Sequence, residues 1–248
     1  MTAIVLRPNA TPVYDFLSYI LATLEEGEDI AGKKVLDCGA GGPLPPLVAF
    51  RQQGCEAWGI DVSDEQLRKA EQFCEGQGID LNLRLGDMRE IPFEDEAFDF
   101  VYEQYSLCHL TKTDTVRAVA EMQRVLKSGG LCLLGLISLD SWTTMLGPEG
   151  EPGEFWMEEG GERVVHSAYS DEEAERLLNA WEVLQKQKRS LWRRASMAKM
   201  SPEEWMDAFG RERDASFREA LAAMYERRES EVQYTHVYFI LRKPEPST

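Results

Sequence analysis

The stretch Lys34-Val35-Leu36-Asp37-Cys38-Gly39-Ala40-Gly41-Gly42-Pro43 decides the fold of this chain. Its apolar start, Val35-Leu36, is typical of a buried strand, and an acid and three glycines follow. Glycines at the end of a strand let the backbone turn sharply and come close to a ligand, because no Cβ stands in the way. In an open α/β sheet, ligands bind outside the carboxyl ends of the strands. The stretch therefore predicts a site for a nucleoside-containing ligand.

Composition limits the class of protein. The 248 residues are 43% hydrophobic, enough for a sizeable core in a single domain over 1–248. The formal charge of −17 argues against nucleic acid or an anionic membrane surface as the main partner. The N-terminal residues 1–8 hold only a three-residue aliphatic run, so we expect neither a signal peptide nor a membrane anchor. The five cysteines form no C-x-x-C pair, which predicts no metal site and a cytoplasmic protein with reduced thiols.

Short apolar runs alternate with amphipathic helical patterns along most of the chain. Capping residues predict helix starts at Thr11, Ser63 and Ser170. A further helix is expected over 113–126, with Val116 among its buried residues. Strands are expected at 34–38, 57–60, 81–85, 98–102, 131–137, 183–190 and 235–241. This alternation predicts an α/β fold with a Rossmann-like, doubly wound and mostly parallel sheet.

Two segments, 139–168 and 192–233, do not fit a minimal doubly wound sheet. Both follow strands that should run parallel to the first strand, so both should leave the sheet at its carboxyl edge, over the glycine loop. This placement makes them candidates for a substrate pocket or lid. A homodimer contact, or a simple cover for the sheet edge, is the alternative. Their aromatic residues could frame an acceptor or form a small separate core; these are Trp142, Phe155, Trp156, Trp192 and Trp205.

An acid closes, or nearly closes, each of the first three predicted strands: Asp37, Asp61 and Asp87. A carboxylate after the second strand can accept hydrogen bonds from both hydroxyls of a ribose. Asp is also a common turn residue, but three acids after successive strands are harder to attribute to turns alone. The nicotinamide-binding fingerprint fails because Leu44 stands where its third glycine belongs, and the loop has no P-loop lysine.

As a set, these motifs resemble the class I S-adenosylmethionine (SAM)-dependent methyltransferase family, in its small-molecule branch. The segments that resemble family motifs, in the family order, are 35–41, 59–63, 86–93, 98–101 and 124–130. The resemblance implies a seven-stranded sheet with an antiparallel last strand. With the two inserted segments, the expected fold is such a sheet with helical insertions at its carboxyl edge. One departure is Pro43, which stands where the family usually has a third glycine. Proline fits a first helical turn, so the next helix could start there.

The resemblance implies S-adenosyl-L-methionine as the cofactor. The loop backbone from Gly39 to Gly41 would approach its methionine part, Asp61 would take the ribose hydroxyls, and Asp87 with Met88 would meet the adenine. Asp37 would either reach the ammonium group through water or hold the loop. The full set of expected cofactor contacts is Tyr14, Asp37, Gly39, Ala40, Gly41, Asp61, Val62, Asp87, Met88 and Glu103.

The implied reaction is an in-line displacement at a sulfonium methyl carbon. The leaving group is a neutral thioether, so the main task is to hold the reacting atoms in line and exclude water. A base is needed only if the acceptor carries a proton at neutral pH. No residue is assigned as catalytic; the candidates are Glu103, Tyr105, His109 and His166, and each could instead shape a wall or pack in the core.

The sequence thus predicts a SAM-dependent methyltransferase that acts on a small-molecule acceptor. One alternative is another group transferase with a related cofactor, such as an aminopropyl transferase. That class tends to show paired acids after the fourth strand, where this chain has only Glu103 followed by Gln104. The other alternative is a non-catalytic module that binds the cofactor, which Pro43 favours.

Overall fold

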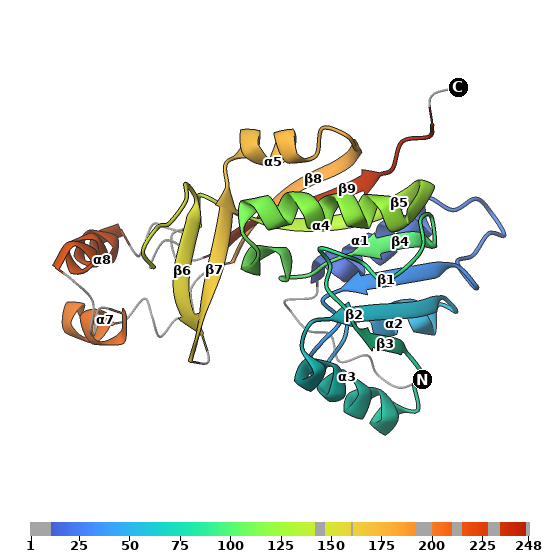
Figure 1. Cartoon of the computed structure of the whole chain (residues 1–248), viewed down its shortest axis with the longest axis horizontal. Coiled ribbons are helices and arrows are strands. Elements are labelled where there is room, and N and C mark those ends of the chain that lie inside the picture. The colour runs from blue at the N-terminus through green and yellow to red at the C-terminus, as the bar shows by residue number, and fades with distance from the viewer. Residues whose placement is uncertain are drawn as a thin grey trace.

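The computed structural model describes residues 11–141, 147–159, 161–191, 200–209, 215–227 and 234–246. Its strands form one sheet (Figure 1) and are β1 (Lys34–Cys38), β2 (Glu56–Asp61), β3 (Asn82–Leu85), β4 (Phe98–Tyr102), β5 (Leu126–Ser138), β6 (Glu154–Glu159), β7 (Glu162–Tyr169), β8 (Glu182–Leu191) and β9 (Tyr234–Arg242). The helices are α1 (Thr11–Ala22), α2 (Leu47–Gln52), α3 (Asp64–Gln77), the 3-10 turn η2 (Leu107–His109), α4 (Lys112–Val125), α5 (Asp171–Leu177), α7 (Pro202–Phe209) and α8 (Ala215–Arg227).

The predicted seven-stranded core is confirmed, in the order β3-β2-β1-β4-β5-β9-β8. The strands from β3 to β5 pair in parallel, whereas β9 pairs antiparallel with both β5 and β8. Strand β8 therefore runs in the direction of β5, and the last strand of the chain is the reversed one. This arrangement brings the ends of β1, β2 and β4 to one edge of the sheet.

Two further strands, β6 and β7, come from the first predicted insertion. Strand β4 ends at Tyr102, which lies opposite Leu133 of β5, but β5 continues to Ser138. Beyond Leu133, β5 thus has no further strand partner in β4, and β7 pairs there in parallel at Ile137 and Ser138. The prediction of a helical insertion is wrong for 139–168, whose described part is a hairpin. The hairpin forms because the end of β5 has a free edge, and the buried backbone N–H and C=O groups of that edge need hydrogen-bond partners.

The second insertion contains two helices as predicted, α7 and α8, within its described residues. Figure 1 places them beyond the β6–β7 hairpin, at the end of the molecule away from β1. Trp205 of α7 and Leu221 of α8 are buried against each other, and Met157 of β6 packs on them. Trp205 therefore belongs to a small separate core. Residues 1–10, Trp142 and Trp192 lie outside the described residues.

Helices cover both faces of the sheet (Figure 1). Helices α4 and α5 pack on one face, and α1 and α2 pack on the other. The predicted inward position of Val116 is wrong, because 57% of its surface is exposed. The buried residues of α4 are Thr115, Ala118, Val119, Met122 and Val125. Within the described residues, no helix combines the length and apolar character needed to cross a membrane.

Candidate functional site

The glycine loop follows β1 and passes beneath the segment after β4. Gly39 has φ +121°, a conformation that side chains rarely adopt, and a Cβ there would collide with the Ser106 hydroxyl. The N–H groups of Gly39 and Ala40 donate to the Ile60 carbonyl at 2.8 and 2.9 Å. The Gly41 N–H donates to Asp61 Oδ2 at 3.0 Å. The loop therefore rests on the end of β2, and of these three residues Gly39 alone lines the adjacent cavity.

Helix α2 does not begin at Pro43. Helix α2 begins at Leu47, after an N-cap at Pro46, so Pro43 lies in the loop and not in the first helical turn. Gly59 supports the same loop, because a Cβ on it would collide with the Ala40 side chain. This role of Gly59 was not predicted from its motif. A glycine in mid-strand is a signal of close packing that could have found it.

Asp61 ends β2 and fixes two backbone segments at once. Its Oδ1 accepts the Ser63 N–H at 2.8 Å, and its Oδ2 accepts the Gly41 N–H. The Ser63 hydroxyl accepts the Gln66 N–H at 3.3 Å, so the predicted N-cap of α3 is present. Each carboxylate oxygen has a second lone pair. Asp61 can therefore hold the loop and still accept hydrogen bonds from a ligand in the cavity that it lines.

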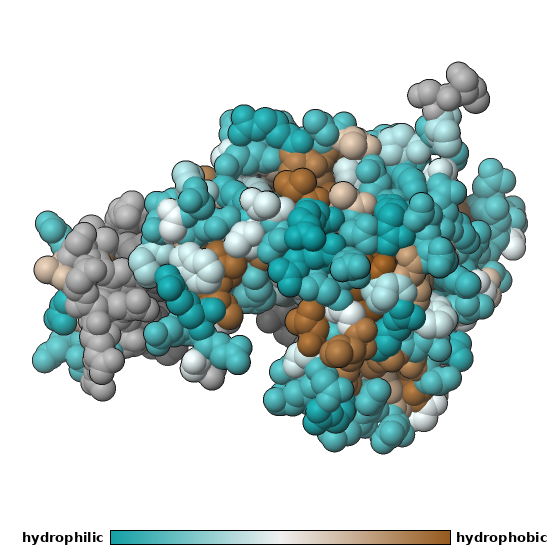
Figure 2. All heavy atoms as spheres, viewed as in Figure 1, coloured by the Kyte–Doolittle hydropathy of each residue, from teal (hydrophilic) through white to brown (hydrophobic). Residues whose placement is uncertain are grey.

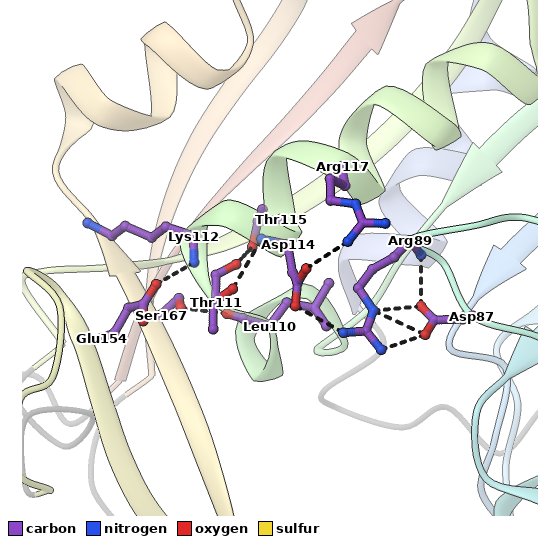
Figure 3. A network of polar contacts seen from close by, with 10 residues as sticks. All are labelled: Asp87, Arg89, Leu110, Thr111, Lys112, Asp114, Thr115, Arg117, Glu154 and Ser167. Carbon is purple, nitrogen blue, oxygen red and sulfur yellow. Dashed lines mark hydrogen bonds and ion pairs between the residues drawn. The ribbon is translucent and has the colours of Figure 1, made fainter.

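Asp87 is bound by Arg89, a residue that was not predicted at the site from the sequence. Arg89 Nη2 donates to Asp87 Oδ2 at 2.6 Å, and Arg89 Nη1 donates to Asp114 Oδ2 at 2.9 Å (Figure 3). These hydrogen bonds hold the pKa of Asp87 below its usual value. Arg89 also lines the cavity, and through Asp114 it links the turn after β3 to the first turn of α4.

Asp37 lies at the end of β1 but is buried and does not line the cavity. The Tyr102 hydroxyl donates to its Oδ2 at 2.8 Å, whereas Oδ1 has no hydrogen-bond partner among the described residues. Burial raises the pKa of Asp37 to about 8, since desolvation disfavours the carboxylate; the Tyr102 hydroxyl lowers it in part. Its side chain holds β1 against β4 beneath the loop. A contact with the cofactor through water stays a prediction.

Glu103 anchors the segment after β4. Its Oε1 accepts the Gly135 N–H at 2.7 Å, and its Oε2 accepts the N–H groups of Ser106 and Leu107 at 3.1 and 3.2 Å. Burial raises the pKa of Glu103 to about 7, and the three backbone donors oppose that rise. Both oxygens face backbone donors of β5 and η2, so the structure gives Glu103 a positioning role. It does not line the cavity.

The cavity has a volume of about 270 Å³. One side is formed by the ends of β2 and β3, and the other by the loop after β4 and η2. It brings together, from the predicted residues, Gly39, Asp61, Val62, Asp87, Met88, Tyr105 and His109. Tyr14, Asp37, Ala40, Gly41, Glu103 and His166 are not among its lining residues. Tyr14 instead packs with the core on the α1 face.

Apolar side chains are exposed at the same edge of the sheet. Val62 and Leu85, at the ends of β2 and β3, are 69% and 61% exposed, and Figure 2 shows an apolar area on the surface near α3. Val62, Met88 and Leu110 also contribute apolar surface to the cavity. An apolar slot beside two carboxylates suits a nucleoside, which has a flat base and a ribose with hydroxyl donors.

All three histidines of the chain gather beside this cavity. His109 ends η2 and lines the cavity, and its ring lies 5.0 Å from that of His166 on β7, nearly edge to face. His236 on β9 is buried, and its ring meets that of Tyr105 edge to face at 4.8 Å. Burial, with His166 nearby, lowers the pKa of His236 to about 3. His236 could not be identified from the sequence, because only the pairing of β9 with β5 places it here.

Tyr105 lines the cavity and lies between it and His236. It has φ +59°, which is uncommon for a residue other than glycine. The Tyr238 hydroxyl donates to the Tyr105 hydroxyl at 3.3 Å. Backbone strain of this kind persists only where neighbouring contacts hold it. Within the described part of the chain, no group of three His, Cys, Asp or Glu side chains is placed to hold a metal ion.

Residues 36–134 match the model of a family described as a methyltransferase domain. The match covers less than half of the chain and contains the glycine loop, Asp61, Asp87 and the segment around His109. It confirms the resemblance that the sequence motifs carry. The solved structure of a SAM-dependent methyltransferase from Methanosarcina mazei has a TM-score of 0.64 and 18% identity, over 91% of this chain and 97% of that one. This likeness confirms the Rossmann-like fold.

Two curated proteins are similar over the same region. The sterol 24-C-methyltransferase ERG6B of Gibberella zeae is 36% identical over 104 residues, which make up 40% of this chain and 26% of that protein. The ubiquinone/menaquinone biosynthesis C-methyltransferase UbiE of Bordetella avium is 39% identical over 105 residues, which make up 42% of this chain and 40% of that protein. The chain therefore matches less than half of the length of either relative.

Proposed function

We propose, from the methyltransferase domain that residues 36–134 form, that this chain transfers a methyl group from S-adenosylmethionine to a small-molecule acceptor. One observation carries the proposal: Gly39, Asp61 and Asp87, from the ends of three successive strands, line a single cavity of about 270 Å³. Relatives that are named as a sterol 24-C-methyltransferase and as a C-methyltransferase of ubiquinone/menaquinone biosynthesis support a small-molecule acceptor.

Each lining group has a task that suits this cofactor. Asp61 would accept the hydrogen bonds of the ribose hydroxyls, and Val62 and Met88 would pack on the adenine. Gly39 would allow the closest approach of backbone to the methionine part. The cofactor supplies an electrophilic methyl group on a sulfonium. The protein would contribute orientation and the exclusion of water, which together can lower a barrier by several kcal/mol.

The Asp61 carboxylate provides the first test of the cofactor site. We expect calorimetry to show saturable binding of SAM and S-adenosylhomocysteine, and Asp61→Ala to weaken both by about tenfold or more, since hydrogen bonds to a charged group are lost. Asp61→Asn keeps one acceptor oxygen and should lose less. Asp64→Ala is the matched control, because Asp64 is an exposed acid in the first turn of α3. No saturable binding, or equal affinity in Asp61→Ala and Asp64→Ala, would refute the site.

Transfer is the second step to test. A screen of small metabolites with SAM labelled in its methyl group should find a labelled product. Binding of the cofactor without transfer to any compound would support the non-catalytic module instead. The related group transferase would be supported by a different result. Decarboxylated SAM would then donate its aminopropyl group, and the labelled methyl group would stay on the sulfur.

Further proposals concern the domain, the inserted segments, the partners and the location of the protein. The chain would act as a single domain in which the β6–β7 hairpin, which packs on η2, forms part of the acceptor pocket. The second insertion would serve as a lid or a homodimer contact, which light scattering can distinguish by the molecular mass in solution. The formal charge of −17 argues against a nucleic-acid partner, and five buried free cysteines suit the cytoplasm.

A further inference from the structure

We propose that a groove beside α1 binds a small zwitterion, of the class of amino acids that carry an apolar side chain. The groove has a volume of about 300 Å³, at the lower end of the range for small-molecule sites, and it shares no lining residue with the cavity of Gly39, Asp61 and Asp87. It is a second ligand site, and its occupation can be tested without the cofactor.

The sheet forms the floor and one side of the groove. Leu133 of β5 is buried, as are Tyr238 and Ile240 of β9, and these three side chains make the floor apolar. Successive side chains of a strand alternate between the two faces of a sheet. Gln187 and Arg189 of β8 are two positions apart, so both lie on the face that carries this floor. The groove therefore has a polar side above an apolar base.

Two opposite charges meet across the groove. Asp15 of α1 and Arg189 of β8 both line it and form an ion pair. The Arg189 Nε donates to Gln187 Oε1 at 2.8 Å, which orients the guanidinium. The side chains of Asp15 and Arg189 are 50% and 26% exposed, and an ion pair so close to water contributes little to stability. A ligand can therefore separate the two charges at low cost.

This pair of charges selects the class of ligand. An anion at Arg189 would be repelled by Asp15, and a cation at Asp15 would be repelled by Arg189. A molecule with both an ammonium and a carboxylate can lie between the two side chains and give each of them a partner of opposite charge. The guanidinium can hold the carboxylate through two parallel N–H donors. The apolar floor then suits an aliphatic or aromatic side chain on the same molecule.

The groove adjoins the first cavity. The hydroxyl of Tyr238, in the floor of the groove, donates to the Tyr105 hydroxyl at 3.3 Å, and Tyr105 lines the first cavity. Burial raises the pKa of Tyr105, and both this hydrogen bond and the nearby Arg189 guanidinium oppose that rise. The two spaces thus meet at a pair of tyrosines. Because they have no lining residue in common, a zwitterion and the cofactor can be bound at the same time.

Three matched probes test the class of ligand by calorimetry. L-phenylalanine carries both charges, 3-phenylpropanoate lacks the ammonium, and phenethylamine lacks the carboxylate. We expect L-phenylalanine to bind saturably at millimolar concentration or below, and each of the other two to bind more weakly by about tenfold or more, because one charged hydrogen bond is lost. Binding of L-phenylalanine should persist with saturating S-adenosylhomocysteine, since that ligand would occupy the other cavity.

Two substitutions locate the site, Arg189→Met and Asp15→Asn. Each removes one of the two charges and should weaken the binding of L-phenylalanine by about tenfold or more. Lys186→Met is the matched control, because Lys186 lies on the same strand but pairs with Glu175 of α5, which packs on the opposite face of the sheet. This control should bind L-phenylalanine as the wild type does. All three variants replace partly exposed charges, so their melting temperatures should stay within about 3 °C of the wild type, which checks that they are folded.

Four results would overturn the proposal. The first three are no saturable binding of L-phenylalanine, equal affinity for L-phenylalanine and either singly charged analogue, and unchanged affinity in Arg189→Met or in Asp15→Asn. The fourth is displacement of L-phenylalanine by S-adenosylhomocysteine, because the amino acid would then occupy the place of the methionine part of the cofactor. None of these results decides the proposed function, which depends on the binding of SAM at Asp61.

Discussion

At the scale of single residues, Gly39 allows a sharp test. We expect Gly39→Ala to lower the free energy of unfolding by about 1–3 kcal/mol, because a side chain at φ +121° is strained and would collide with Ser106. Gly76→Ala is the matched control: Gly76 lies in α3 with open space around it, and alanine favours helix, so stability should stay or rise by up to about 1 kcal/mol. Urea denaturation measures both. Equal midpoints for the two variants would contradict the strain argument.

Residue types at strand ends could be predicted better than the roles of their side chains. The glycines and acids of the first three strands are local signals, and Gly39, Asp61 and Asp87 do line one cavity. Glu103 and Asp37 were also expected at the cofactor, but both carboxyls are buried against the protein. Position after a strand cannot show which way a side chain turns. Arg89 and His236 were missed because only the fold brings Arg89 to Asp114 and His236 to Tyr105.

At the scale of elements, local signals predicted helix starts, and long-range pairing decided the rest. Ser63 and Ser170 cap α3 and α5 as expected, because a cap depends on residues three positions apart. In α4, Val119 and Met122 are buried as the helical pattern predicts, and Val116 of the same pattern is exposed. The β6–β7 hairpin could not be predicted, because its partner is an edge of β5 that exists only once β4 has ended.

Glu154 tests how this hairpin is attached. Its buried carboxylate accepts the Lys112 N–H at 2.6 Å, at the first residue of α4 (Figure 3). We expect Glu154→Ala to cost about 1–3 kcal/mol of stability and to raise amide exchange across β6 and β7, because a charged hydrogen bond is lost. Glu158→Ala, an exposed acid on the same strand, should change stability by less than about 0.5 kcal/mol. Unchanged exchange in Glu154→Ala would show that other contacts hold the hairpin.

At the scale of the whole molecule, the fold creates two kinds of acid whose pKa values shift in opposite directions. Asp87, Asp99, Glu121 and Glu173 are paired with cations, and their pKa values are lowered. The stability that they contribute is lost as the pH falls through the acid range. Asp37 and Glu103 are buried, and their pKa values are raised to about 8 and about 7. Composition shows the net charge of −17 but cannot separate these kinds, because burial is a property of the fold.

The sign for the buried pair follows from proton counts. Above pH 4 the unfolded chain releases the protons of Asp37 and Glu103, whereas the folded chain keeps them up to about pH 7–8, so the free energy of unfolding falls as the pH rises through this window. We therefore expect the melting temperature to be highest near about pH 5 and to decline toward pH 8. Asp37→Asn should remove much of that decline and raise the melting temperature at pH 8 by at least about 3 °C, since one pKa unit corresponds to about 1.4 kcal/mol. Asp64→Asn, at an exposed acid, should keep the wild-type slope. Calorimetric melting of the three proteins from pH 5 to 8 decides the matter: a parallel decline in Asp37→Asn and the wild type would mean that Asp37 is ionised in the folded protein.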